Sequence, residues 1–320
     1  SKIQELLNKY CKFLPISAKF GTKEETLPAE EVKEGEKAKD PEKITVDNII
    51  NNANPAWAKA PSELVGEDYK TFYKELYPMS FEEPLFHIHL NVDYPFNLTG
   101  ILYFPKLSPN MEVQKNKIQL YCNQVFVTEQ VEGIVPDFLT VLHGVLDSPD
   151  IPLNVSRSYL QSDQNVKKIS SHITKKIADK LKELVTKDRN DFESKWDDIK
   201  VFIEFGMLSD DKFADRSKKF MLYKNVKSEY FLIDEYLEKI KVNQVNKENK
   251  TVILYTHDTV AHHAAISRAE EKGYDVLVMD TALSSHLVNK LEQSNTDVTF
   301  ARIDSDTIEK LILKDEELPS

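Results

Sequence analysis

The amino-acid sequence predicts an α/β (α+β) fold. A larger α-β-α layered domain is expected at residues 1–156, a helical connector at 157–245 and a smaller α-β-α subdomain at 246–320. Three observations lead to this prediction. Residues of the first part alternate between apolar and polar, which is typical of strands. Apolar residues of the second part recur at helical spacing. The third part alternates strand and helix patterns with short links, which indicates a parallel sheet.

The larger domain is expected to combine a sheet with covering helices. Helices are predicted at 1–10, 67–77 and 135–147, where apolar residues share one face. Strands are predicted at 13–20, 84–92, 97–105 and 117–129. Between the first two strands, residues 22–43 carry thirteen charges in 22 positions and no aromatic residue. Such a segment cannot bury enough apolar area to offset its chain entropy, so we predict a mobile charged loop.

The connector is predicted to be helical throughout. Its first helix is expected to open near Arg157 and to carry a stripe of apolar residues at 3.6-residue spacing, namely Ile169, Ile173, Ile177, Leu181 and Leu184. Further helices are expected at 197–210 and 228–240. In the smaller subdomain, strands are predicted at 250–256, 274–280 and 297–304, and helices at 258–273 and 282–293. A glycine at the end of the first of these helices, Gly273, is a typical stop signal.

Composition excludes several classes of protein. The formal net charge of −11 argues against a binder of duplex nucleic acid, which needs a basic face. No apolar run approaches the roughly 18 residues that span a bilayer, and the first residues lack the apolar stretch of a signal peptide. The two cysteines, Cys11 and Cys122, argue against a disulfide framework and fit a reducing compartment such as the cytoplasm.

Glycine is scarce and evenly spread. The eight glycines never lie within ten residues of each other. A Walker loop or a GxGxxG turn needs clustered glycines so that the backbone can approach phosphate. Neither motif is present, so this sequence does not bind a nucleotide through such loops.

Histidines offer two candidate metal sites. His87 and His89 point the same way along a predicted strand and could share a metal ion, but no third ligand stands at a recognisable spacing. His257, His262 and His263 gather at a helix start. For both groups we favour ordinary roles, half-exposed strand residues in the first and helix capping with surface exposure in the second.

Five further residues are candidates for a functional role. Asp280 follows a predicted strand, where α/β folds place ligands, and could serve phosphotransfer; we favour a helix N-cap instead. Met207 and Leu208, beside Gly206, could form an exposed apolar patch. Trp57 and Phe126 are expected to lie in the core or on a contact surface.

Arg157 stands at the expected start of the long helix, and Gln161 follows four residues later on the same face. The positive pole of the helix dipole disfavours a cation there, so an anion is expected nearby. Asp147 or Asp150 could supply it through a salt bridge. Alternatively, the planar guanidinium could complete a phosphate site of another domain and stabilise the charge on a transferring γ-phosphoryl group.

Several stretches together resemble the heat-shock protein 90 chaperone family in its middle domain. "GVLDSPDIPLNVSRSYLQ", at 144–161, is the most specific of them. "NPAWAKAPSEL" and "EDYKTFYKEL" resemble the opening of that domain. "GILYFP" and "LYCNQVFV" resemble its sheet strands, and "VILYT" and "YDVLVMD" its small α/β subdomain. The resemblance covers nearly the whole chain, in order, and points to a bacterial-type member.

The resemblance implies a homodimeric, ATP-driven chaperone that binds unfolded clients and takes part in the stress response. Its larger middle subdomain would resemble domain 2 of ribosomal protein S5. The N-terminal domain that binds ATP with Mg²⁺ and the C-terminal dimerisation domain are expected to be absent here, so no cofactor is expected in this fragment, nor a nucleic-acid or membrane partner.

The same resemblance assigns residues. It implies that Arg157 reaches the γ-phosphate, with Gln161 and Asn154 supporting the catalytic loop; Ser158 departs from the acidic residue common there. Trp57 and Phe126 match positions for client or interdomain contact. Two other functions stay open, namely an interaction scaffold without an ATPase role and a small α/β phosphotransfer enzyme.

Overall fold

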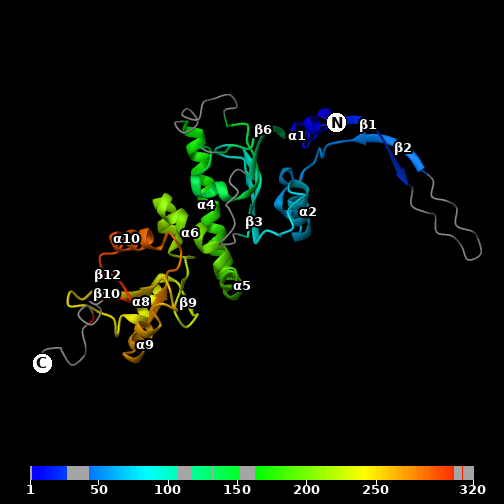
Figure 1. Ribbon diagram of the computed structural model, residues 1–320. Helices are drawn as coiled ribbons and strands as arrows, with labels where there is room; N and C mark the ends of the chain where they lie inside the picture. Colours follow the sequence, from blue (N-terminus) through cyan, green and yellow to red (C-terminus); the bar gives the residue numbers. More distant parts are fainter. Residues whose placement is uncertain are drawn as a thin grey trace, which may run out of the picture. The chain divides into compact units, whose positions relative to one another are not determined.

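The structure is a computed structural model that describes residues 2–26, 43–106, 117–131, 133–151, 163–305 and 312 (Figure 1). The chain forms two compact units. Unit 1 comprises Ser1–Pro105, Gln114–Ile134 and Thr140–Ile169, and unit 2 comprises Lys106–Val113, Val135–Leu139 and Ser170–Ser320. Unit 2 thus takes in most of the predicted connector together with the smaller α/β part. The boundaries of the three predicted parts stay a prediction.

Unit 1 is built on a five-stranded mixed sheet in the order β3-β4-β7-β5-β6. The strands are β3 Phe86–Val92, β4 Leu98–Phe104, β5 Lys117–Cys122, β6 Val125–Thr128 and β7 His143–Asp147. β5 and β7 are parallel, and the other neighbours are antiparallel. Gly144 permits the close approach of β7 to β4, because its φ is +128° and an added Cβ would stand 2.0 Å from the carbonyl oxygen of Ile101.

The prediction of a helix at 135–147 is wrong. A short 3-10 helix, η3 Asp137–Val141, leads into β7 instead. Residues Gly144 to Asp147 are all buried, and β7 is the middle strand of the sheet. A strand buried on both faces shows no polar alternation, and its apolar run cannot be told from a buried helix by periodicity.

The predicted strand at 117–129 is a hairpin of β5 and β6. Asn123 and Gln124 both have positive φ, 50° and 64°, which lets a two-residue turn reverse the chain. Residues 22–26 and 43, predicted as part of the charged loop, lie in strands instead, because β1 Lys19–Thr26 pairs antiparallel with β2 Lys43–Ile49. Residues 27–42 of that prediction lie outside the described residues. Residues 13–18, predicted as strand, precede β1. Backbone pairing and surface ion pairs such as Lys19–Asp47 need no apolar core.

Unit 1 also contains α1 Lys2–Tyr10, η1 Ala56–Ala58, η2 Pro61–Glu63 and α2 Gly66–Leu76. One face of α2 is buried as predicted, through Tyr69, Phe72, Tyr73 and Leu76. These side chains pack with other buried residues in a largely aromatic cluster that includes Phe13, Trp57, Ile101, Tyr103, Tyr121 and Val145.

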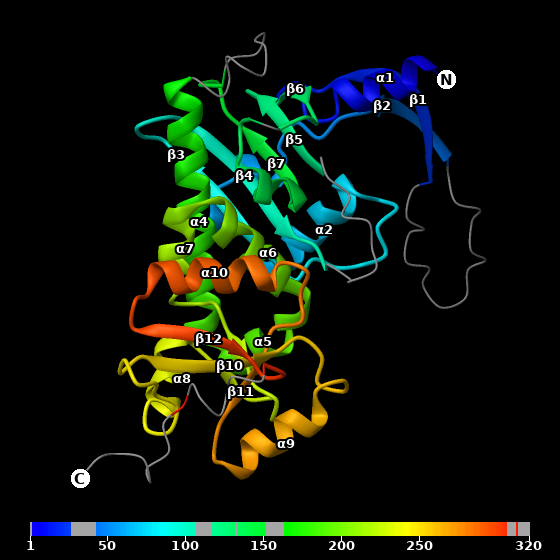
Figure 2. The same cartoon turned by 60° about the vertical axis from the view of Figure 1, so that its left-hand side comes forward.

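Unit 2 combines helices with a small sheet (Figure 2). The long helix α4 Gln164–Lys187 begins within unit 1 and continues into unit 2. It is followed by α5 Arg189–Ser194, α6 Trp196–Ser209, α7 Asp211–Ser217, the short pair β8 Tyr223–Lys224 and β9 Tyr230–Phe231, and α8 Ile233–Ile240.

The last part of unit 2 is a parallel three-stranded sheet in the order β11-β10-β12. Its elements are β10 Thr251–Thr256, α9 His263–Glu271, β11 Val276–Val278, α10 Ser284–Ser294 and β12 Val298–Arg302. The predicted α/β fold class, with a small parallel unit at its end, is confirmed. Gly273, at φ +77°, follows α9 as expected. Among the described helices, none is long and apolar enough to cross a membrane.

Candidate functional site

The predicted catalytic loop follows the central strand of unit 1. Arg157, Gln161 and Asn154 all lie in residues 152–162, outside the described residues. The structure therefore describes the two ends of this segment rather than the three side chains. Strand β7 ends at Asp147 and leads toward the segment, and α4 begins at Gln164 on its far side.

The entrance to the loop is anchored by hydrogen bonds. The Asp147 carboxylate is 7% exposed, and its Oδ2 accepts from Trp57 Nε1 at 3.2 Å and from the backbone N of Gln124 at 2.9 Å. Asp150 Oδ2 accepts from the backbone N of Asn97 at 2.7 Å, and Ser148 Oγ donates to the carbonyl of Asn97 at 2.6 Å. Both aspartates proposed as partners of Arg157 thus already accept hydrogen bonds from other groups.

The exit of the loop is capped by a carboxylate. Asp163 Oδ1 accepts from the backbone N of Asn165 at 2.8 Å and from that of Val166 at 3.1 Å. These bonds satisfy two free N–H groups of the first turn of α4, and the negative charge suits the positive end of the helix dipole. A residue of this chain therefore supplies an anion at the N-terminus of the described helix. The sequence carries a signal for this cap, because an aspartate directly before a run of apolar residues at helical spacing is a typical helix start.

Trp57 belongs to the core of unit 1. Its side chain is 1% exposed, and its ring lies 4.7 Å from that of Phe13 and 5.2 Å from that of Tyr121, between ring centroids. Phe126 on β6 is half-buried at the margin of the same cluster, 5.6 Å from the rings of Tyr121 and Tyr10. In this conformation a partner could reach Phe126 but not the ring of Trp57.

The histidines of β3 have aromatic partners. His87 stacks on Tyr69 with ring centroids 3.7 Å apart, and His89 Nδ1 lies 3.0 Å from the Tyr69 hydroxyl. Burial lowers the pKa of His89. His262 Nδ1 lies 2.8 Å from Thr256 Oγ1, and its ring makes an edge-to-face contact with that of His257, at an interplanar angle of 83°. Within the described ranges, no group of three His, Cys, Asp or Glu could hold a metal ion.

A cluster of charged side chains surrounds the carboxyl end of β11. Asp280 is not an N-cap: its carboxylate pairs with Lys200 on α6 at 2.9 Å, and Lys200 also contacts Asp197 at 3.0 Å. Glu204, one turn further along α6, is 4% exposed and accepts a hydrogen bond from the hydroxyl of Thr281. Burial raises the pKa of Glu204 to about 7. Sequence reasoning missed Glu204, although a single acid within the apolar run 201–208 marked it.

The expected apolar patch beside Gly206 is wrong for Met207, which is 4% exposed. Gly206 packs against the rings of Phe213 and Phe138, where an added Cβ would come within 2.6 Å of Phe213. The α6–α7 corner is therefore closed by contacts inside unit 2, and Met207 lines a cavity there.

Comparison with known proteins identifies the family. A family model with the description "Hsp90 protein" matches residues 17–317 of the chain. The chain is 56% identical over 315 residues to the chaperone protein HtpG of Porphyromonas gingivalis, covering 98% of this chain and 44% of that protein. It is 54% identical over 316 residues to HtpG of Bacteroides fragilis, covering 99% and 45%.

The chain belongs to the Hsp90 family.

A solved structure agrees with this Hsp90 assignment at the level of the fold. The middle domain of a Plasmodium falciparum heat shock protein superposes with a TM-score of 0.60 at 20% identity, covering 78% of this chain and all of that one. The family model and the HtpG relatives confirm the predicted resemblance to the Hsp90 family. A homologue of endoplasmin from Caenorhabditis elegans is more distant, at 32% identity over 319 residues, covering 91% of this chain and 40% of that protein.

This Hsp90-family chain spans less than half of the HtpG proteins that it matches, 44% and 45% of their lengths. ATP turnover, clients and assembly are properties of whole proteins, and they enter below as proposals.

Proposed function

We propose that this chain acts as the middle segment of an ATP-dependent molecular chaperone. In the full-length protein it would contact client proteins and supply Arg157 to the γ-phosphate of ATP held by an N-terminal domain. The supporting observation is the anchoring of both ends of residues 152–162, by Asp147 and Asp150 before and by Asp163 after, around a stretch that carries the family resemblance.

The proposed chemistry follows from the residue types. A guanidinium is planar, permanently charged and presents paired N–H donors, which suit phosphate oxygens. Charge that develops on a transferring phosphoryl group would be stabilised by Arg157, while Gln161 and Asn154 hold the loop. Mg²⁺ would arrive with the ATP. The isolated chain is expected not to hydrolyse ATP.

The test is steady-state ATP turnover by the full-length protein. Arg157→Ala should lower kcat on the order of 10³-fold, with little change in ATP affinity, because the interaction is made in the transition state. Arg157→Lys should recover only part of the loss, since a point charge cannot replace the fork. Arg268→Ala is the matched control, because Arg268 is an exposed arginine on α9 of unit 2. Unchanged turnover in Arg157→Ala would leave the interaction scaffold as the function.

The client contact is proposed to use Phe126 directly and Trp57 through the packing of unit 1. Phe126→Ala should weaken binding of an unfolded client protein to the full-length chaperone. Phe81→Ala serves as control, because Phe81 is 98% exposed in the same unit and lies outside the aromatic cluster. An equal loss of client binding in both variants would indicate non-specific hydrophobic association rather than a specific binding site. Trp57→Phe should affect signalling between domains more than client affinity.

Assembly and location complete the proposal. The full-length protein is proposed to form a homodimer through its C-terminal domain and to work in the cytoplasm, without nucleic-acid or membrane partners. Both cysteines of this chain are unpaired thiols, which suits a reducing compartment. Light scattering of the full-length protein tests the dimer, and cell fractionation tests the location.

A further inference from the structure

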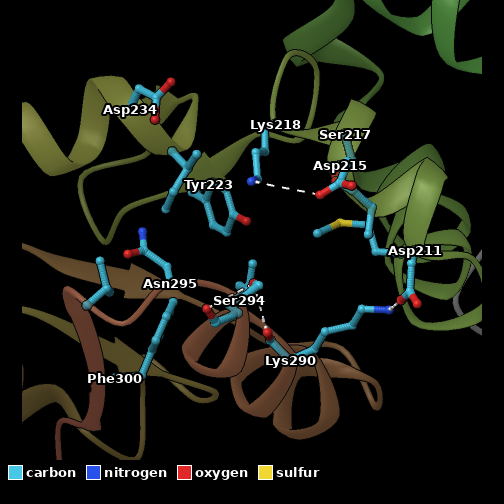
Figure 3. A pocket seen from close by; sticks show the side chains of 15 residues that line it. Asp211, Asp215, Ser217, Lys218, Tyr223, Asp234, Lys290, Ser294, Asn295 and Phe300 are labelled. Atoms are coloured by element: carbon cyan, nitrogen blue, oxygen red, sulfur yellow. Dashed lines mark hydrogen bonds and ion pairs between the residues drawn. The ribbon is translucent and has the colours of Figure 1, made fainter.

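Unit 2 holds a cavity of about 370 Å³ that serves neither the proposed catalytic loop nor the proposed client contact. Residues from α6, α7, β8 and the start of α8 line one side, and residues from α10 and β12 line the other (Figure 3). Its volume falls within the range of small-molecule sites, roughly 300–1,000 Å³. The cavity therefore has room for a compact organic ligand.

The walls of the cavity are largely apolar. They are formed by side chains from elements that are far apart in the sequence, namely Met207, Ile233, Leu291, Val298 and Phe300. Met207 and Val298 are buried, at 4% and 7% exposed. Water in contact with such walls makes few hydrogen bonds, so an apolar body would replace it favourably.

One buried polar group points into this apolar space. Tyr223 on β8 is 5% exposed, and Figure 3 shows its hydroxyl directed toward the centre of the cavity. The hydroxyl donates no hydrogen bond to a residue that the structure describes, and its oxygen is open to the cavity. It can therefore donate a hydrogen bond to a ligand that brings an acceptor.

Most other polar groups of the lining are already engaged. Ser217 Oγ donates to the carbonyl of Ala214 at 2.6 Å, and Ser294 Oγ donates to that of Lys290 at 2.9 Å. Lys290 Nζ is held by Asp211 at 2.6 Å. These groups therefore offer little to a ligand.

Lys218 is the available cation. Its Nζ reaches Asp215 only at 4.0 Å, and the two side chains are 59% and 81% exposed, so the pair is weak. Figure 3 shows the Lys218 amine and the Tyr223 hydroxyl on the same side of the cavity, while the Asp234 carboxylate points away from it. One hydroxyl donor and one ammonium group thus face a common space at the apolar wall.

We propose that this cavity is a binding site for a small organic carboxylate with an apolar body. The carboxylate would accept hydrogen bonds from Tyr223 Oη and Lys218 Nζ, and the body would lie against Met207, Leu291 and Phe300. A charge-assisted hydrogen bond is stronger than a neutral one, so the carboxylate is preferred over an amide of the same shape. The site is independent of the proposed chaperone role.

The probe is benzoate, compared with benzamide and benzylamine, which keep the ring and change the charge. Of the four methionines that the structure describes, only Met207 lines this cavity, whereas Met221 and Met279 line a separate one. In a protein with labelled methionine methyl groups, millimolar benzoate should shift the Met207 signal saturably and leave the other signals in place. Benzamide should bind more weakly, and benzylamine should not bind.

Two substitutions test the polar contacts. Tyr223→Phe keeps the ring and removes the hydroxyl, and Lys218→Met keeps the length and removes the charge. Each should weaken benzoate binding roughly 10- to 150-fold, the effect of one lost hydrogen bond to a charged group. Lys219→Met is the matched control, because this exposed neighbour does not line the cavity. Tyr223→Phe should also fold with unchanged or higher thermal stability, since it removes a hydroxyl that donates no hydrogen bond to a described residue.

Three results would overturn the proposal. They are the absence of a saturable Met207 shift with benzoate, binding of benzylamine as tight as that of benzoate, and benzoate binding that is equally tight in Tyr223→Phe and the parent protein.

Discussion

Each unit of this protein contains an ionisable side chain whose pKa is shifted by burial, a partly buried histidine in unit 1 and a buried glutamate in unit 2, and the two shifts have opposite signs. In unit 1, burial and, to a smaller extent, the charge of Lys117 together lower the pKa of His143 from 6.5 to about 4. In unit 2, burial raises the pKa of Glu204 from 4.5 to about 7. Desolvation favours the neutral form in both cases, and the neutral form is deprotonated for histidine and protonated for glutamate.

The two units should therefore respond to pH in opposite directions. Between pH 4.5 and 7, folded unit 2 keeps a proton on Glu204 that the unfolded chain has released, so the contribution of Glu204 is greatest below pH 4.5 and falls as pH rises. Between pH 6.5 and 4, the unfolded chain protonates His143 while folded unit 1 does not. The contribution of His143 is therefore complete above pH 6.5 and is lost as pH falls.

The two tryptophans of the chain can report on the units separately. Trp57 lies in the core of unit 1, and Trp196 on α6 is 3% exposed in unit 2, where it lines the small cavity of about 110 Å³ beside Glu204. Fluorine NMR of protein made with fluorotryptophan should give one signal for each. Denaturant titrations followed at each signal then give the free energy of unfolding unit by unit.

The largest effect is expected for Glu204→Gln. The amide keeps an acceptor for the Thr281 hydroxyl but cannot ionise, so unit 2 should gain roughly 3 kcal/mol at pH 8 and nothing at pH 4.5. The measurement is the Trp196 titration at both pH values. An equal change at both would show that packing, rather than ionisation, distinguishes the variant.

His143→Gln should give the next largest effect. The Tyr73 hydroxyl lies 2.9 Å from His143 Nδ1, and glutamine can replace that contact without titrating near neutral pH. The loss of unit 1 stability from pH 8 to pH 4.5 should shrink by about 2 kcal/mol, after allowance for the partial exposure of His143. The Trp57 titration reports it. If the unfolding free energy of unit 1 changes with pH equally in the parent protein and in the variant, His143 is not the cause of that pH dependence.

Lys200→Met should have a smaller effect, in unit 2. The charge of Lys200 lowers the pKa of Glu204, so its removal should raise that pKa further and destabilise unit 2 at pH 8 by about 1 kcal/mol. At pH 5, where Glu204 is protonated, the loss should be less. Lys195→Met, which breaks the more exposed pair with Asp191, is the control and should show little pH dependence.

Lys117→Met should produce the smallest effect. Its positive charge lowers the pKa of His143, so the variant should raise that pKa toward the unfolded value and stabilise unit 1 by a few tenths of a kcal/mol at pH 5. A titration of the His143 imidazole by NMR measures the shift directly. Lys19→Met is the control, since Lys19 pairs with Asp47 on the β1–β2 hairpin. A shift of His143 in the control alone would contradict the assigned cause.

The two sheets differ in how far the sequence predicted them. The parallel sheet of unit 2 is predictable because each of its elements has a recognisable local sequence pattern. These patterns are an apolar strand at β10, an amphipathic helix at α9 and the helix-ending residue Gly273. The mixed sheet of unit 1 was predicted only in part. Its central strand β7 looked like a helix, since its burial comes from β4 and β5 rather than from its own pattern.

The candidate sites divide in the same way. Motif resemblance placed Arg157, Gln161 and Asn154 in one stretch, and the N-cap role of Asp163 follows from its residue type. The partners of Asp147 did not follow from the sequence, because Trp57 and Gln124 approach it from other elements. Asp280 was expected to cap a helix, and its actual partner, Lys200, stands 80 residues away.

The sequence by itself determined the fold class, the family, the absence of glycine-rich phosphate loops and the acidic balance, because these depend on residue types and short-range order. Tertiary structure alone decided which side chains are dehydrated. The hydroxyl that contacts His143 comes from a residue 70 positions away, and the hydroxyl that contacts Glu204 comes from one 77 positions away. The free energy of ionisation depends on the atoms that displace water around a group, and distant elements provide those atoms only after folding.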